Sequence, residues 1–306
     1  MVKAPRFFDI FFKRNRIRET AGDRVFYFFV LCVMWLAIAV TLYPFMYVLS
    51  MSLSSPVAVL KQQVWLFPIG INFGAYTRVL NERMIWVAYG NTIYYTFFGT
   101  AINVIMTIML AYPLSRKKFM GKNVVTLFAS ITMLFSGGMI PHFLLIRNLG
   151  LYNTRWAMIL PGAIGVYNMI IARTFFTTIP ESLHESMAID GANDLRILIS
   201  VVLPLSKPII AVLVLFYAVG HWNTYFSALL YLPNTNLHPL QMYLVRLLVR
   251  DQLLMAEAGV DALELAMQTL QTKYSTIIVV MTPIMCVYPF LQKYFAQGVM
   301  IGSIKE

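Results

Sequence analysis

The hydrophobic pattern of this 306-residue chain consists of long apolar runs separated by short polar segments. A bilayer span needs about 20 mostly apolar residues, and six runs are long enough. We expect membrane-spanning helices over residues 25–51, 86–112, 124–146, 156–176, 205–232 and 276–295. The first run is too long for the hydrophobic region of a signal peptide and no small-x-small cleavage site follows it, so we expect it to remain as a helix. The pattern predicts an all-α integral membrane protein with six transmembrane helices.

The composition supports this prediction. Hydrophobic residues make up 59% of the chain and charged residues only 12%, and the mean hydropathy is +0.70. A soluble domain carries about 25% charged residues, so this chain has too few charges to cover a water-exposed surface. An ordinary soluble enzyme and a disordered chain are therefore excluded. The formal net charge of +11 is spread between apolar runs, so we expect no nucleic-acid partner.

The basic residues are divided unequally between the two sets of loops. With a cytoplasmic N-terminus, sixteen basic and eight acidic residues lie on the inner side, against eight basic and five acidic residues on the outer side. Because cytoplasmic loops carry an excess of Lys and Arg, both termini are expected in the cytoplasm. Most of the +11 therefore records the orientation of the helices.

The apolar runs lack the residues that ion-coupled transport and catalysis need. They contain no Asp or Glu, and their only Lys and Arg residues, Arg173, Lys207 and Lys293, lie close to the ends of the runs, whereas ionisable residues deep within spans normally mark ion or proton pathways, so a secondary carrier is disfavoured. His184-Glu185 begins like the zinc-protease motif HExxH, but Ala188 stands where the second zinc ligand would be. No nucleotide-binding Walker A loop occurs. These absences also disfavour a membrane-embedded lipid-modifying enzyme, and we expect no metal or cofactor on this chain.

The segment 180–204, on the expected cytoplasmic side, predicts two short helices joined by a turn. Pro180 can begin the first helix, where its missing N–H costs nothing, and acidic residues complement the positive helix end. Gly191 supplies a left-handed position to end that helix, and a second helix ends near Pro204. A mixed apolar and acidic outward face is typical of a docking element for a soluble partner. A solvated connector is the alternative.

These residues resemble the EAA loop of ABC-importer permeases. Glu185-x5-Gly191-x9-Val201-x-Leu203-Pro204 has the spacing of the family pattern Glu-Ala-Ala-x3-Gly-x9-Ile-x-Leu-Pro. Asp190-Gly191-Ala192 is similar to the Asp-Gly-Ala of the carbohydrate branch, whereas Ser186 and Met187 replace the two alanines. The segment Ser136-Gly137-Gly138-Met139-Ile140-Pro141 and the ending 292–302 are similar to poly- and oligosaccharide permeases.

The resemblance implies a MetI-like permease domain over residues 86–296, with 180–204 as its coupling loop. A basic N-terminal segment (1–24) and a first helix with its outer segment (25–85) would precede this domain, and a cytoplasmic tail (297–306) would follow it. Residues 1–24 suit either a helix lying in the membrane interface or a plain basic flank. The implied protein is a multi-pass, non-catalytic subunit of an ATP-driven importer in the bacterial inner membrane.

The resemblance also implies partners and a substrate class. The partners are a second homologous permease subunit, an ABC ATPase dimer that binds ATP and Mg, and an extracytoplasmic solute-binding protein. The substrate class is oligosaccharides, with a lean toward uronate-containing ones such as alginate fragments. The residues expected to dock on the ATPase are Glu181, Leu183, Glu185, Met187, Ala188, Asp190, Gly191 and Ala192.

Polar and aromatic residues within the apolar runs suggest where a sugar would pass. Proteins bind sugars by aromatic stacking and by amide and hydroxyl hydrogen bonds. Polar groups at membrane depth must face protein or a water-filled cavity. The candidates for the substrate path are Asn103, Tyr167, Asn168, His221, Trp222, Asn223 and Tyr225. Hydrogen bonding between helices is the alternative role for each.

Overall fold

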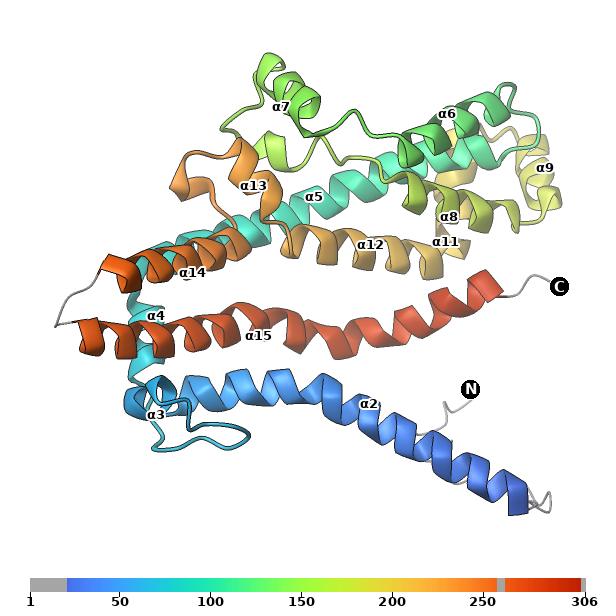
Figure 1. Ribbon diagram of the computed structural model, residues 1–306. Coiled ribbons are helices and arrows are strands. Elements are labelled where there is room, and N and C mark those ends of the chain that lie inside the picture. The colour runs from blue at the N-terminus through green and yellow to red at the C-terminus, as the bar shows by residue number, and fades with distance from the viewer. Residues whose placement is uncertain (1–20, 258–261, 304–306) are drawn as a thin grey trace.

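The computed structural model describes residues 21–257 and 262–303, and every regular element in these ranges is a helix. The long helices are α2 (Ala21–Leu53), α5 (Arg83–Ser115) and α15 (Ala262–Ser303), which run between the two ends of the molecule (Figure 1). Each contains a stretch long and apolar enough to cross a membrane. They overlap the first, second and sixth predicted spans. The predicted basic segment 1–24 lies almost entirely outside the described residues, as does the end of the predicted tail.

The third predicted span is broken in the middle. Helix α6 (Lys122–Leu134) and helix α7 (Met139–Asn148) meet at an angle of 116°. The break coincides with the Ser-Gly-Gly sequence, and Gly138 has a φ of +86°, which residues with a side chain rarely adopt. Continuous hydrophobicity across residues 124–146 concealed this backbone break.

The fourth and fifth predicted spans are also interrupted. Residues 156–176 contain the short η1 helix (Arg155–Met158), a non-helical linker and α8 (Val166–Thr177), whose 12 residues are too short to cross a bilayer. The fifth run forms α12 (Lys207–Trp222) and, after a break, α13 (Phe226–Tyr231). The segment Asp194–Leu205 also meets α12 at a bend of 84°. By length and composition, the described residues offer three spanning helices, or up to five if this bent pair and the pair α6 and α7 each count as one span. The count of six remains a prediction.

Short helices occupy the two ends of the molecule. At one end lie α3 (Pro56–Leu60), α4 (Gly74–Asn81) and α14 (Leu240–Glu257), with η3 (Thr235–Leu237) preceding α14 in the chain. At the other end lie α9 (Glu181–Ile189), α10 (Asp194–Ile197), η2 (Leu198–Val202) and α11 (Leu203–Leu205). The beginning of α2 and the end of α15 lie at this same end as α9 (Figure 1).

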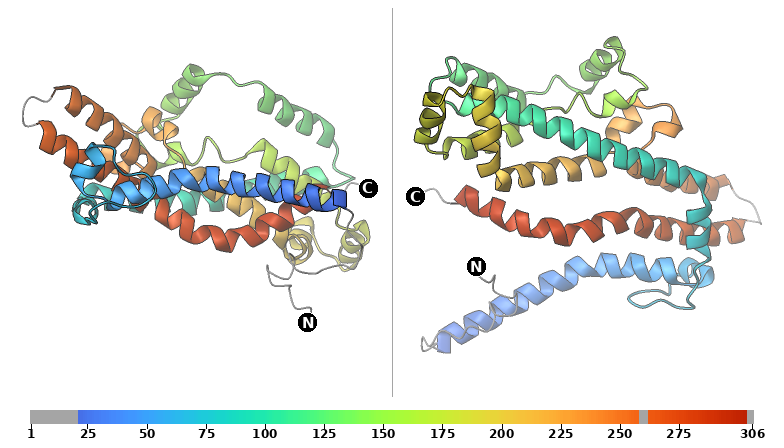
Figure 2. Two further views of the ribbon diagram at one scale, coloured as in Figure 1. Left: turned by 60° about the horizontal axis from the view of Figure 1, so that its bottom comes forward. Right: turned by 180° about the vertical axis from the view of Figure 1, so that it is seen from behind.

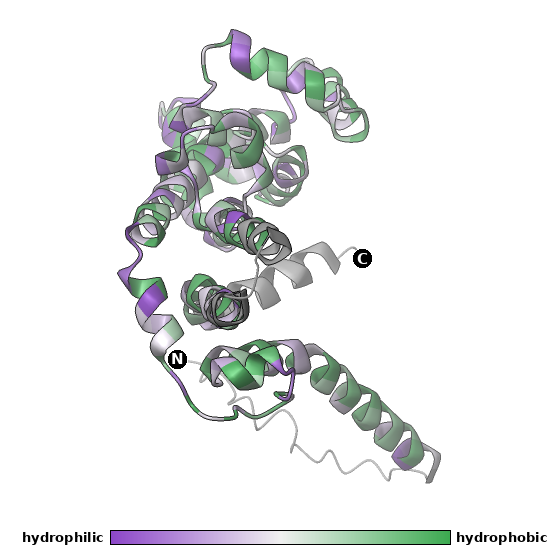
Figure 3. Ribbon diagram, turned by 60° about the vertical axis from the view of Figure 1, so that its left-hand side comes forward, coloured by the Kyte–Doolittle hydropathy of each residue, from purple (hydrophilic) through white to green (hydrophobic). Residues whose placement is uncertain are grey.

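Helix α5 is central because it packs against both α8 and α12. The largest apolar core forms where these three helices meet, and it includes Ile108 and Ala111 from α5, Met169 from α8 and Leu213 from α12. By contrast, α2 packs mainly on α15 and diverges from the other helices toward its beginning (Figure 2). Its exposed surface is almost continuously hydrophobic (Figure 3). This surface suits lipid or a partner subunit.

Candidate functional site

A polar cavity of about 370 Å³ lies between α5, α7, α12 and α13. Its polar lining comprises Asn103, His142, Tyr217, His221, Thr224, Ser227 and Tyr231, and no Asp, Glu, Lys or Arg is among the described lining residues. The cavity is thus surrounded by neutral hydrogen-bonding groups within an otherwise apolar set of helices. Such a lining suits hydroxylated, uncharged groups better than ions.

Two side chains hold the non-helical linker 159–165 against this cavity. The Asn103 amide nitrogen donates to the carbonyl of Gly162 at 2.8 Å. The Tyr217 hydroxyl accepts from the Gly165 amide at 3.0 Å and bonds to the Thr107 hydroxyl at 2.6 Å. Irregular backbone at membrane depth is tolerated where protein groups satisfy it or where it lines a cavity. These bonds explain how a broken helix can stand beside α5.

Some polar atoms of the site have no partner among the described residues. The Asn103 side-chain oxygen and the His221 Nε2 are both buried and unpaired there. Asn103 itself is only 3% exposed, and its amide nitrogen is already engaged with Gly162. Buried polar groups normally bond to protein or to water. The oxygen is therefore an acceptor that water or a sugar hydroxyl can use.

The structure brings Asn103 and His221 into one cavity and places the other path candidates elsewhere. Tyr167 is 58% exposed on α8, while Asn168 is buried but does not line the cavity. Trp222 packs on a separate apolar cluster that includes Ile85. The remaining two candidates, Asn223 and Tyr225, are exposed and also lie outside the cavity lining.

Most of the polar residues that line this cavity were not among the predicted path candidates, and His142, Tyr217 and the neighbouring Gly99 contribute most to its geometry. His142 comes from α7, and its Nδ1 bonds to the Tyr231 hydroxyl at 2.9 Å. Tyr217 positions the linker, as described above. Gly99 allows α5 to approach the ring of His221, because a side chain there would overlap that ring. The signal for His142 was its place inside an apolar run, but only the bend between α6 and α7 turns it toward α13.

Replacement of Gly99 with alanine should destabilise the packing of α5 on α12. The added methyl carbon would lie 2.4 Å from His221 Nε2, so the ring or the helix must move. Overpacking of this kind costs about 1–3 kcal/mol, which should lower the melting temperature of the purified protein. Gly90→Ala is the matched control, since Gly90 lies on the same helix with no atom within 4 Å of the added carbon. Equal melting temperatures for the two variants, or no recovery in Gly99→Ala/His221→Ala, would contradict this packing.

The second candidate element is the α9–α10 hairpin, which follows the predicted helix–turn–helix. Gly191 adopts a φ of +77°, and its amide donates to the Ala188 carbonyl at 3.0 Å. Asn193 caps α10 by accepting from the Arg196 amide at 2.9 Å. The predicted left-handed glycine is therefore present, and it sets the direction in which α10 leaves α9.

The outward face of this hairpin mixes apolar and acidic side chains. Ile189 is 86% exposed and Leu195 is 63% exposed. Neither was among the predicted docking residues, of which Leu183, Glu185, Ala188, Asp190 and Gly191 are exposed. Met187 and Ala192 instead pack against the main apolar core. The predicted docking residues are thus divided, with one part anchoring the hairpin and the other facing outward.

The hairpin is attached to the end of α5. Arg116 Nη2 lies 2.8 Å from Glu181 Oε1, so Glu181 faces α5 rather than an external partner in this structure. The ring of His184, which is 3% exposed, stacks on Tyr112 at 6.3 Å between ring centroids. Sequence reasoning missed both Arg116 and His184. One helix, α5, therefore contacts the exposed hairpin at its end and lines the polar cavity in its middle.

Burial lowers the pKa of His184 below its ordinary value of 6.5. The neighbouring Arg116 lowers the pKa further, whereas the Pro180 carbonyl, Glu181 and Asp194 act in the opposite direction. A histidine whose pKa is lowered while its ring is packed in the fold binds protons more readily once the ring is released to solvent. The contribution of His184 to the packing of α9 on α5 is therefore present above pH 6.5 and declines as the pH falls below that value.

Acidification should accordingly loosen α9. We expect amide protection over residues 181–189 to fall between about pH 7.5 and about pH 5.5, the range over which a histidine changes charge. Hydrogen exchange corrected for its intrinsic pH dependence measures this effect. His184→Gln keeps a neutral side chain, so its protection should change much less. An equal change in the wild type and this variant would assign the effect to another group.

Comparison with known proteins agrees with these features. Residues 11–301 match the family described as binding-protein-dependent transport system inner membrane component. Protein LplC of Bacillus subtilis (strain 168) is 39% identical over 268 residues, which cover 87% of this chain and 90% of that protein. The polygalacturonan/rhamnogalacturonan transport system permease protein YtcP of the same organism is 40% identical over 265 residues, covering 86% and 92%.

A solved structure agrees with the fold. The crystal structure of a bacterial ABC transporter involved in the import of the acidic polysaccharide alginate contains a chain with a TM-score of 0.83 and 35% identity. The match covers 91% of this chain and 99% of that chain. Permeases of this family are non-catalytic and work with a separate ATPase subunit and a solute-binding protein. The chain therefore belongs to the binding-protein-dependent transport system inner membrane components and is a MetI-like permease subunit of an ABC importer.

Proposed function

We propose that this chain forms one half of the translocation path of an oligosaccharide importer and that uronate-bearing oligosaccharides are among its substrates. A second homologous permease subunit forms the other half. An extracytoplasmic solute-binding protein delivers the sugar, and an ABC ATPase dimer supplies the energy. ATP and Mg bind only to that ATPase, and this chain holds no cofactor.

A single observation carries the proposal, namely the position of α5. Its end contacts the α9–α10 hairpin through Arg116 and Tyr112, and its middle contributes Asn103 to the polar cavity. A force applied to the hairpin by an ATPase would therefore reach the helix that lines the cavity. Rigid-body movement between two packed arrangements is the usual form of such coupling.

Two further features support details of the proposal. The beginning of α2 and the end of α15 lie at the same end as α9, which supports an arrangement with six spans and both termini cytoplasmic (Figure 1). The relatives named above include a polygalacturonan/rhamnogalacturonan permease and a chain from an alginate importer. Both names refer to acidic polysaccharides, which supports uronate-bearing substrates.

Co-purification tests the proposed assembly. We expect the tagged chain, expressed together with the genes that accompany it, to bring down one ATPase dimer and one second permease chain in stoichiometric amounts. The complex should import an oligosaccharide only when ATP and the binding protein are both present. Transport by this chain alone, without an ATPase, would contradict the proposal and favour a secondary carrier.

A further inference from the structure

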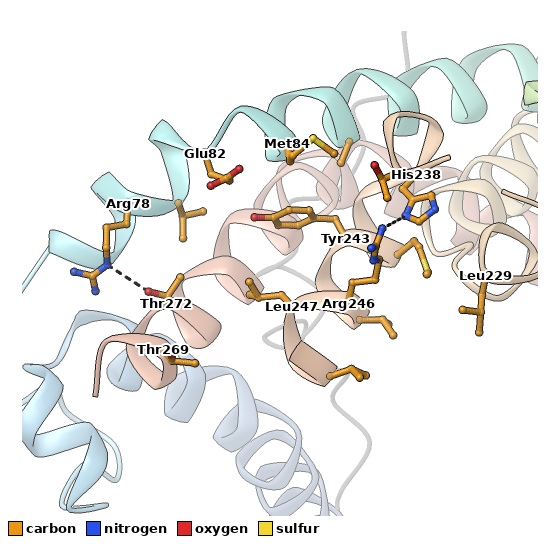
Figure 4. Close-up of a pocket in the computed structure, with 16 residues that line it drawn as sticks. Arg78, Glu82, Met84, Leu229, His238, Tyr243, Arg246, Leu247, Thr269 and Thr272 are labelled. Atoms are coloured by element: carbon orange, nitrogen blue, oxygen red, sulfur yellow. Dashed lines mark hydrogen bonds between the residues drawn. The ribbon is translucent and has the colours of Figure 1, made fainter. Parts of the chain in front are cut away.

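A second and larger cavity, of about 870 Å³, lies at the end of the molecule opposite α9. It is an open pocket lined mainly by α4, the beginning of α5, α14 and α15 (Figure 4). Two arginines line it, Arg78 from α4 and Arg246 from α14, together with Glu82 as the one acidic residue of the described lining. In the proposed orientation this end faces the outside, where a delivered substrate would first meet the permease.

Arg78 is oriented by a buried neutral side chain. Its Nη2 donates to Gln271 Oε1 at 3.3 Å, and its Nε donates to the Thr272 hydroxyl at 3.4 Å. Gln271 is fully buried, and its amide nitrogen donates to the carbonyls of Ser54 and Asn72. Because those bonds use the amide nitrogen, the Gln271 oxygen is left to face the guanidinium. This arrangement orients Arg78 without neutralising its charge.

Arg246 is held by the same kind of arrangement. Its Nη1 lies 3.3 Å from Nδ1 of His238, a residue only 6% exposed. His238 Nε2 donates to the Leu232 carbonyl at 2.7 Å, so Nδ1 carries no proton and accepts a hydrogen bond from Arg246. Burial lowers the pKa of His238, which favours this neutral form. Arg246 therefore also keeps its full charge.

Neither guanidinium has a carboxylate partner among the described residues, where the one ion pair joins Arg116 and Glu181 at the other end of the molecule. The planar guanidinium fork is suited to binding carboxylates through two parallel hydrogen bonds. Figure 4 shows Arg78 and Arg246 toward opposite ends of the cavity, with the ring of Tyr243 between them. Two charged ends and a central ring suit a ligand with repeated carboxylates and apolar sugar faces.

We infer that this outer cavity binds the carboxylate groups of an acidic oligosaccharide and that Arg78 and Arg246 are the residues that select for them. The inference rests on the proposed function, because it takes an oligosaccharide importer as given. It adds a charge-selective entry site, distinct from the neutral cavity around Asn103. The arginines discriminate by charge before the sugar reaches the uncharged part of the path.

Uptake by the complete complex in proteoliposomes, supplied with its binding protein and ATP, tests this site. The probes are trigalacturonate and an alginate trisaccharide. Each is supplied with its carboxylates ionised and, separately, as the methyl ester, which carries no charge. Arg78→Gln and Arg246→Gln should each lower uptake of the acids roughly tenfold, since hydrogen bonds between charged groups are the strong ones in proteins. Uptake of the esters should stay at the wild-type rate. Arg83→Gln is the matched control, because Arg83 is exposed nearby but does not line the cavity.

The outcomes separate this inference from the proposed function. If the wild-type complex imports none of the four sugars, the proposed function fails. If it imports sugars but the two arginine variants handle acids and esters alike, the proposed function stands and the carboxylate site is refuted. An equal loss for both forms together with a weaker apparent affinity for the binding protein would assign the arginines to protein docking instead, which also overturns the inference.

Discussion

Replacement of Gly191 with proline is expected to abolish ATP-driven uptake while the chain still inserts into the membrane. Gly191 has a φ of +77° and donates its amide to the Ala188 carbonyl. Proline fixes φ near −65° and has no N–H, so the turn between α9 and α10 cannot form. Uptake should fall by at least about tenfold, because coupling free energies of 1–3 kcal/mol correspond to changes of about 5–150-fold. Uptake in proteoliposomes measures the loss, and membrane fractionation measures insertion.

Gly121→Pro is the matched control for this prediction. Gly121 also has a positive φ, +85°, and at both positions no atom lies within 4 Å of an added side-chain carbon. The two substitutions therefore impose similar backbone strain, but only Gly191 lies in the proposed docking hairpin. We expect Gly121→Pro to retain most of its uptake. Equal activity of the two variants would remove the coupling role of the hairpin.

Reversal of the charge at Glu185 is expected to separate the permease from its ATPase. Glu185 is exposed on α9, close to the exposed side chain of Ile189, and forms no ion pair with any described residue. If it meets a basic residue of the ATPase, Glu185→Lys places two like charges together in a desolvated contact. Losing one partner of such a pair costs about 2–5 kcal/mol, so ATPase recovery and stimulated hydrolysis should fall at least about tenfold.

Glu185→Gln serves as the graded control. It removes the charge with almost no change in shape, so its loss should be measurable but smaller than that of Glu185→Lys. Co-purification of the ATPase and the rate of ATP hydrolysis are the two readouts. A fully active Glu185→Lys complex would show that this carboxylate does not contact the ATPase.

The continuous helices were the most predictable part of the fold. The backbone of a long apolar segment must satisfy its own hydrogen bonds in lipid, so hydropathy alone identifies helices such as α2 and α5. The breaks were not predictable in this way, because an apolar run continues straight through them. At Gly162 and Gly165 the freed backbone groups are satisfied by Asn103 and Tyr217, which are distant in sequence. Such breaks depend on tertiary contacts that no window of the sequence contains.

The residues of the candidate sites were likewise predictable where they depend on local sequence and not where they depend on contacts between distant helices. The turn at Gly191 was predictable, because a left-handed position after a helix is a local property. The polar residues Asn103 and His221 stood out within apolar runs, and both line the cavity. His184 could not be placed from the sequence, because the inward face of α9 depends on where α5 ends. The role of Gly99 could not be predicted either, because it depends on the closeness of the His221 ring from α12.

We propose that sugar delivery at one face of this permease is coupled to ATP hydrolysis at the other. The most direct measurement is the ATPase rate of the purified complex in lipid, with its binding protein either empty or loaded with an oligosaccharide. We expect the loaded binding protein to stimulate hydrolysis and Gly191→Pro to remove this stimulation. A rate that is the same with loaded and empty binding protein, for every neutral and acidic oligosaccharide tested, would contradict it.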